Sequence, residues 1–295
     1  MTNFSHWLHD ARVSIASLLI AFALACTIAN SIYSQGPSIE LSPGVHVPLA
    51  TSALSGVDSN QQSAVLARIA GDDGWEKFSK ATQVAPVRIQ VQPVLDTNQK
   101  RIGHDIRSAF VLHGSLETLK NQELLETIFG KSSEQGFQIR ELTKLELDSV
   151  SITEEERKKS RFLVMEFPLL QRVQITSMLR MQMESTSSQI QANWYVDRRW
   201  EGKIDSINQY AILKEDDFGK KRAQPPVPYY GMGGSLFVTQ LEQPTTALLV
   251  ESQLVLFEPE EWFHGSNQLR SKLPLTFQEN ARTFRRRVMS AKTEK

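Results

Sequence analysis

The residues best suited to chemistry lie together near the C-terminal end of the chain, in FEPEEWFHGSNQLR (257–270). Carboxylates beside a histidine can transfer protons or bind a metal ion, so Glu258, Glu261 and His264 form a candidate polar site. However, no second histidine stands at metal-ligand spacing, and no HExxH motif occurs. Acidic residues also favour the first turn of a helix through the helix dipole. We therefore expect this group to begin a helix, and we predict no catalytic residue, no metal site and no cofactor.

The remaining motifs give no clear sign of catalysis. His104 and His113 bracket a predicted strand, but no GxSxG motif supplies a nucleophile for a triad. The glycines of YYGMGGS (229–235) precede a strand rather than a helix, so they do not form a phosphate-binding loop. We interpret this segment as a turn or the rim of a cavity, with Tyr229 and Tyr230 at the mouth.

Composition excludes further classes of function. The chain has 33 basic and 33 acidic side chains, so its formal net charge is zero and nucleic acid is not an expected partner. Its one cysteine is Cys26, so residues 27–295 form no disulfide and carry out no thiol chemistry. The 40% content of hydrophobic residues is enough for a substantial core.

An apolar segment near the N-terminus predicts export. No charge occurs between Arg12 and Glu40, and VSIASLLIAFALACTIA (13–29) is about 17 residues long, close to the lower limit for a membrane-spanning helix. We predict a signal peptide or an N-terminal membrane anchor over residues 1–34. Cleavage, retention and lipid attachment at Cys26 all stay open. Each places the protein on the periplasmic side of a bacterial cell envelope, with membrane association through residues 13–33.

The rest of the chain is divided by composition. Residues 35–57 are rich in Gly, Pro and Ser and are expected to form a flexible tether. Residues 58–295 are expected to form a single α+β domain. Within it, residues 58–106 are an N-terminal extension, and residues 107–290 are the core. EEERKKSR (154–161) is predicted to be a solvated charged loop.

Periodicity predicts antiparallel strands followed by a long helix. Apolar residues alternate in RFLVMEF (161–167), RVQITSMLRMQMES (172–185) and QIQANWYVD (189–197), which is typical of half-buried strands. A hairpin is expected where Pro244 precedes two threonines. One apolar stripe runs from Leu269 to Val288 at spacings of three and four, so this helix covers one sheet face. The side chains expected between sheet and helix are Met165, Met181, Met183, Trp194, Tyr229, Tyr230, Leu248, Val250, Phe277 and Phe284.

Two features of this C-terminal helix leave alternatives open. Pro274 lies inside the stripe, so the helix either begins near it or is kinked there. Arg285, Arg286 and Arg287 lie near the helix end, where cations offset the dipole. The same basic patch is also suited to contact anionic lipid headgroups.

The order of these elements resembles the START-like helix-grip (SRPBCC) superfamily. RSAFVLHGSLETLKNQEL (107–124) is similar to its first strand and following helix, and GSLFVTQLEQPTTALLVESQLVLFEP (234–259) is similar to its last hairpin. WFHGSNQLRSKLPLTFQENARTFRRRV (262–288) is similar to its closing helix. The resemblance covers about residues 107–290. It implies a curved antiparallel sheet around a long C-terminal helix, with an apolar cavity between them.

We therefore expect a membrane-associated envelope protein that binds a lipid or another apolar ligand without catalysing a reaction. Two alternatives stay open. One is an envelope scaffold with a filled core. The other is a hydrolase or cyclase that uses Glu258, Glu261 and His264.

Overall fold

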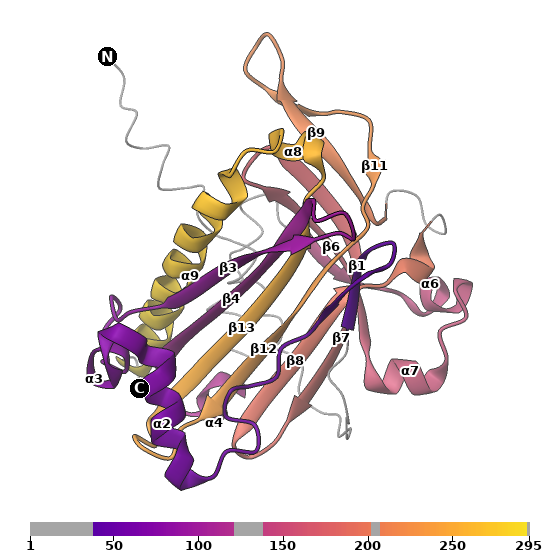
Figure 1. The fold of residues 1–295 in the computed structure, drawn as a ribbon. Coiled ribbons are helices and arrows are strands. Elements are labelled where there is room, and N and C mark those ends of the chain that lie inside the picture. Colours follow the sequence, from indigo (N-terminus) through magenta and orange to yellow (C-terminus); the bar gives the residue numbers. More distant parts are fainter. Residues whose placement is uncertain (1–37, 121–137, 202–206, 294–295) are drawn as a thin grey trace.

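The computed structural model describes residues 38–120, 138–201 and 207–293. The predicted export segment, including residues 13–33, lies outside these ranges. Within them, no helix is both long enough and apolar enough to cross a membrane. The described chain forms one large antiparallel sheet, with a long C-terminal helix on one face and several smaller elements on the other (Figure 1). The predicted α+β class, an antiparallel sheet packed on a C-terminal helix, is confirmed.

The strands of the main sheet all pair antiparallel with their neighbours. From one edge to the other, the order is β3 (Arg88–Leu95), β4 (Arg101–His113), β13 (Ala247–Phe257), β12 (Met232–Gln240), β8 (Gln189–Val196), β7 (Val173–Ser185), β6 (Arg161–Leu169) and β5 (Gln138–Glu141). Beyond the end of β8, the edge of β7 is taken by β9 (Gln209–Glu215), which carries β10 (Lys221–Ala223) and β11 (Val227–Pro228).

Strand β7 pairs with β8 over one part of its length and with β9 over another, and Asn208 lies at the gap between these two partners. Its backbone is left-handed, with φ of 54°, and its side chain is buried. The amide oxygen accepts a hydrogen bond from the Met178 N–H at 2.9 Å, and the amide nitrogen donates to the Asp197 carbonyl at 3.1 Å. Since unpaired backbone groups in a sheet are costly, this side chain replaces the missing strand contact.

Helix α9 (Gln268–Thr293) lies along the inner face of the sheet, and its backbone approaches β3 and β4 most closely. The helix begins six residues before Pro274, so the proline is part of it. Because proline has no N–H, the Arg270 carbonyl four residues earlier loses its helical hydrogen bond, but the helix continues to Thr293. The predicted apolar stripe is buried: Leu269, Leu273, Phe277, Ala281, Phe284 and Val288.

Arg285 holds α9 in place from inside the protein. Its side chain is 3% exposed, and its guanidinium donates to the carbonyl oxygens of Val111, Ala85 and Pro86. The guanidinium also lies 5.4 Å from the centre of the Phe110 ring. Burial lowers the pKa of Arg285 to about 10. Of the two roles left open for the basic patch, contact with lipid headgroups does not apply to Arg285, because its guanidinium is buried in contacts that join α9 to β4 and to the segment before β3.

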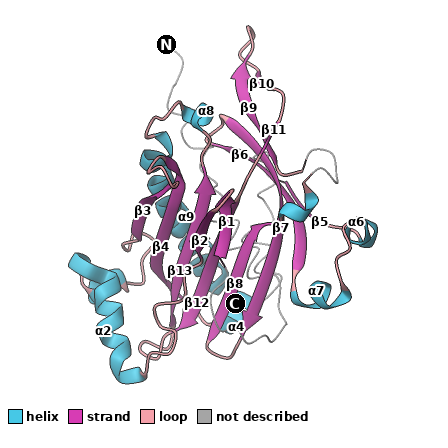
Figure 2. Cartoon of the chain, turned by 45° about the vertical axis from the view of Figure 1, so that its right-hand side comes forward, coloured by secondary structure: helices cyan, strands magenta, loops and turns pink. Residues whose placement is uncertain are grey.

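The outer face of the sheet is covered by three separate groups of elements (Figure 2). Helices α2 (Ser59–Ala70) and α3 (Trp75–Phe78) cover one end of β4 and β13. The hairpin of β1 (Ser38–Ser42) and β2 (Val45–Pro48) covers the middle. Helices α6 (Lys144–Ser149) and α7 (Glu154–Lys159) lie beside β6 and β7. Residues 154–159, expected in a loop, are helical because Thr153 and Glu156 form a capping box.

The prediction of a flexible tether over residues 35–57 is wrong from residue 38 onward. Ile39 and Leu41 are buried against the outer face, and the following segment is tied to β13. The Ala50 N–H donates to the Gln253 side chain at 2.6 Å, and Glu251 accepts hydrogen bonds from Ser52 Oγ and the Ala53 N–H. The Gly, Pro and Ser content reflects turns between these contacts. The extension is also shorter than expected, because β3 and the start of β4 belong to the sheet.

If Arg285 fixes α9, replacing it should destabilise the fold. We expect Arg285→Met to lower the free energy of unfolding by about 3 kcal/mol, since hydrogen bonds from a buried charged group are lost and their acceptors stay buried. Chemical denaturation measures this loss. Arg286→Met is the matched control, because Arg286 is the exposed neighbour on the same helix and should change stability by less than about 0.5 kcal/mol. Equal effects of the two substitutions would contradict this role.

Candidate functional site

The inner face of the sheet is one continuous apolar surface. Residues paired across antiparallel strands project to the same side, so the register identifies this face. Ile106 pairs with Leu254, and Met181 pairs with Trp194. These side chains are all buried, although only part of the sheet lies close to the α9 backbone. The inner face is therefore enclosed even where the α9 backbone does not approach it closely.

Two clusters of buried side chains divide this interior. The first, which we call the upper cluster, surrounds the start of α9, and the second, the lower cluster, surrounds its later turns. Five predicted cavity residues lie in the upper cluster: Met165, Met181, Trp194, Tyr229 and Phe277. Three lie in the lower cluster, namely Leu248, Val250 and Phe284, and Met183 packs against its border. Tyr230 does not belong to either: it is 38% exposed and stacks edge-on against Phe257 under the Arg198 guanidinium.

Polar groups are placed within this apolar interior. Ser108 and Ser252 pair across β4 and β13, with their hydroxyl oxygens 2.7 Å apart. Ser177 is fully buried on the inward side of β7. Asn280, on α9 between Phe277 and Ala281, is 2% exposed. Among the described residues, the Ser177 hydroxyl and the Asn280 amide nitrogen have no hydrogen-bond partner.

Asn280 lies level with the serine pair along the interior. The Arg101 guanidinium donates to the Asn267 side chain just before α9, and Arg285 contacts Val111 near the end of β4, so strand and helix run in the same direction. Counted from Arg101, Ser108 lies about 23 Å along β4, at the rise per residue of a strand. Counted from Asn267, Asn280 lies about 20 Å along α9, at the rise per residue of a helix. The polar groups of sheet and helix therefore share one level, near the boundary of the two clusters.

A buried ionisable group lies at the other end of the upper cluster. His104 projects inward from β4, opposite Leu256, and is 1% exposed. Its Nε2 lies 2.6 Å from a carboxylate oxygen of Glu258, and the Arg101 guanidinium is 3.6 Å from the same oxygen. His104 Nδ1 has no partner within the described ranges.

The predicted polar site at residues 258–264 is not assembled. Glu258 points inward to His104, whereas Glu261 accepts a hydrogen bond from the Tyr210 hydroxyl. His264 is exposed and ends the short helix α8 (Glu260–Phe263) in a left-handed conformation. The expected helix start is confirmed, and it is the reason that these side chains diverge. Burial and the bond to Glu261 raise the pKa of Tyr210.

The pairing of His104 with Glu258 was missed because 154 positions separate the two residues. The sequence did carry one signal. His104, Ile106, Ser108 and Phe110 are every second residue of one strand, so their side chains lie on the same, inward face. The described residues contain no group of three or more His, Cys, Asp or Glu side chains placed to hold a metal ion.

Comparison with known proteins gives similarity in fold only. No family model matches the chain, and no curated protein matches it in sequence. Among solved structures, human STARD10 is 12% identical with a TM-score of 0.36, and the match covers 66% of this chain and 69% of that one. The human StarD13 (DLC2) lipid transfer and protein localization domain is 6% identical with a TM-score of 0.39, covering 68% and 84%. A STAR-related lipid transfer protein from Xanthomonas axonopodis is 11% identical with a TM-score of 0.39, covering 68% and 93%.

These structures belong to the group that the order of elements resembled. The helix-grip arrangement itself is visible in the sheet order and in the course of α9. At such low identities and TM-scores, the similarity says nothing about the ligand or activity of this chain.

The buried pair should show strong energetic coupling. His104→Leu leaves the Glu258 carboxylate buried without its nearest partner, so we expect a loss of about 3 kcal/mol in the free energy of unfolding. Glu258→Leu should cost a similar amount. The double variant should lose clearly less than the sum of the two, because it leaves no charge of the pair behind. Additive losses in denaturant unfolding would show that the two side chains do not stabilise each other.

Proposed function

We propose that this protein binds a lipid or another apolar molecule between the sheet and α9, and that it does so without catalysis. The observation that carries this proposal is the placement of two polar groups without partners among the described residues, the Asn280 amide nitrogen and the Ser177 hydroxyl, inside a mainly apolar interior. A buried polar group without a partner costs roughly 1–3 kcal/mol. A ligand with an apolar body and one polar group would offset this cost.

The side chains around these groups suit such a ligand. Met165, Met181 and Met183 project from neighbouring strands into or against the interior. Methionine has three rotatable bonds and a polarisable sulfur, so it adapts to irregular apolar shapes. The polar level formed by Ser108, Ser252 and Asn280 would then select molecules with a hydroxyl, ester or amide group.

The N-terminal sequence indicates where in the cell this protein would bind its ligand. A run of apolar residues over 13–33 without charge favours export and retention near a membrane. We therefore propose that the domain acts on the periplasmic side of a cell envelope and exchanges its ligand with a membrane.

Filling the interior should block loading. We expect the full-length protein, purified after expression with its export segment, to carry lipid adducts that native mass spectrometry detects and organic solvent releases. Met181→Trp and Leu248→Trp should remove these adducts, since each adds bulk to one inner cluster. Gln191→Trp is the control, because Gln191 lies on the outer face of β8.

Two results would overturn the proposal. One is a protein without adducts that takes up nothing from an added lipid extract, which would favour a scaffold with a filled core. The other is equal loading of the variants with Trp on the inner face and the control, which would place the ligand elsewhere.

Asn280 should separate stability from binding. Asn280→Leu replaces an amide without a partner by an apolar group of similar size, so the ligand-free protein should gain roughly 1–2 kcal/mol in the free energy of unfolding. The same substitution should weaken lipid loading. Asn280→Asp, which keeps the size and places a charge in the interior, should destabilise the protein. A loss of stability in Asn280→Leu would show that the amide is already satisfied.

A further inference from the structure

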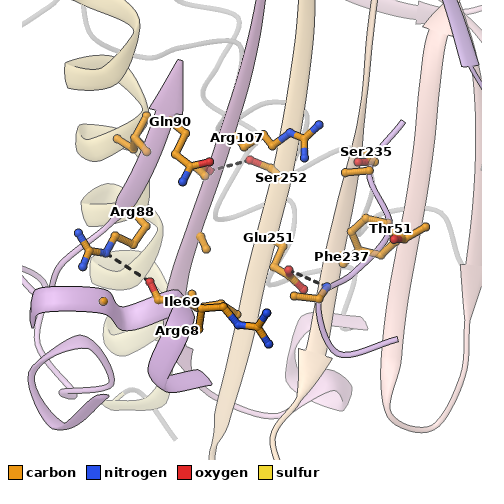
Figure 3. A pocket seen from close by; sticks show the side chains of 16 residues that line it. Thr51, Arg68, Ile69, Arg88, Gln90, Arg107, Ser235, Phe237, Glu251 and Ser252 are labelled. Carbon is orange, nitrogen blue, oxygen red and sulfur yellow. Dashed lines mark hydrogen bonds between the residues drawn. The ribbon is translucent and has the colours of Figure 1, made fainter. Parts of the chain in front are cut away.

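A pocket lies on the outer face of the sheet, opposite the face that α9 covers. It has a volume of about 490 Å³ and is open to solvent (Figure 3). Its floor is formed by β3, β4, β13 and β12, and its walls are the last turn of α2 and the segment 50–53. The hollow exists because two floor positions carry small side chains, Ala109 and Ser235. No described helix crosses the sheet between α2 and the β1–β2 hairpin.

Three arginines from three different elements line this pocket: Arg68 of α2, Arg88 of β3 and Arg107 of β4. Arg88 is committed to structure, because it donates to the carbonyl oxygens of Ile69 and Ala70 at the end of α2. Arg107 is held by Asp105, through Nε and one terminal nitrogen, at 3.2 and 3.0 Å. Its other terminal nitrogen has no hydrogen bond within the described ranges.

Arg68 is the cation with no counterion in this part of the protein. It is exposed, and neither an ion pair nor a hydrogen bond of its side chain occurs among the described residues. Figure 3 shows Arg68 and Arg107 on either side of Glu251. No ion pair within 4 Å joins that carboxylate to either arginine among the described residues, and its two oxygens accept from Ser52 Oγ and the Ala53 N–H. The lining carries three arginines and Glu251, and Asp73 and Asp105 next to it offset Arg88 and Arg107, so a dianion would leave a larger excess of negative charge here than a monoanion.

The rest of the pocket lining consists mainly of apolar side chains and a few uncharged polar groups. Phe237, Ile69 and Ala109 provide a surface for an apolar body. Ser235, 1% exposed at the floor, has a hydroxyl without a partner among the described residues. Guanidinium groups bind carboxylates through parallel N–H donors, which an ammonium group does not offer.

We propose that this outer pocket is a binding site for a small organic monocarboxylate, held at its charged end by Arg68 and Arg107, with its apolar body against Phe237. The site is separate from the apolar interior, because the sheet itself lies between them. Its occupation therefore does not depend on lipid binding to the inner face.

Hexanoate and hexanol are matched probes for this proposal, since they share an apolar chain and differ in the carboxylate. Isothermal titration of the full-length protein should show binding of hexanoate that is at least about tenfold tighter than binding of hexanol at this site. Arg68→Gln and Arg107→Gln should each weaken hexanoate by about tenfold and leave hexanol unchanged. Arg270→Gln, an exposed arginine of α9, is the control.

A second substitution guards against unfolding as the cause. Ala109→Leu should fill the floor of the pocket and abolish hexanoate binding while the unfolding temperature and lipid loading persist. The proposal is overturned if hexanoate does not bind. It is also overturned if hexanoate and hexanol bind equally and Met181→Trp blocks both, which would place them in the interior. Loss of lipid adducts with retained hexanoate binding would instead overturn the proposed function alone.

Discussion

The buried guanidinium of Arg285 is the constraint on which the arrangement of sheet and helix depends. It lies at the meeting point of α9, β4 and the segment before β3, and its partners are carbonyl oxygens rather than a carboxylate. Removing a cation from water is costly, so these contacts are favourable only when all three elements are in place together. The position of α9 over β3 and β4 therefore follows from this side chain as well as from the apolar stripe. That position leaves the inner face of β12, β8 and β7 away from the helix backbone, although the apolar side chains of this face are buried.

The second constraint is the strict alternation of a sheet that is covered on both faces. Neighbouring residues of β4 serve different purposes: Arg107 faces the outer pocket, and Ser108 faces the interior. The same holds on β13, where Glu251 holds the segment 50–53 and Ser252 pairs with Ser108. A shift of one residue in either strand would exchange these faces, so the register of the central strands determines both candidate sites at once.

Much of the fold could be predicted because its elements have strong local signals. The helix that begins after Asp58, the alternating strand over 172–185 and the stripe of α9 each follow from periodicity and caps. Long-range contacts could not be predicted in this way. The hairpin over 38–48 resembles a linker in composition, but Ile39 and Leu41 pack against the sheet, and the segment that follows is bound to Glu251 and Gln253 of β13. Most of the predicted cavity residues do lie inward, since strand parity fixes the face of a side chain. The alternation of side chains along a strand gives the face of each residue but not its contacts with distant residues, so the pair of His104 and Glu258 was missed.

The interior polar groups distinguish a binding protein from a protein with a closed core. Selection for stability alone would favour an apolar residue at position 280, because the Asn280 amide nitrogen has no partner among the described residues and is costly beside Phe277, Ala281 and Phe284. Binding sites commonly keep such unfavourable groups, since their cost is recovered when a ligand provides the missing partner. In contrast, the polar groups of His104, Glu258 and Arg101 contact one another. His104 Nδ1 also lacks a partner among the described residues, but this group is held together by its own contacts, whereas Asn280 Nδ2 and Ser177 Oγ have no such contact there. This difference within one interior is why we place the ligand beside Asn280 and Ser177 and not at the buried histidine.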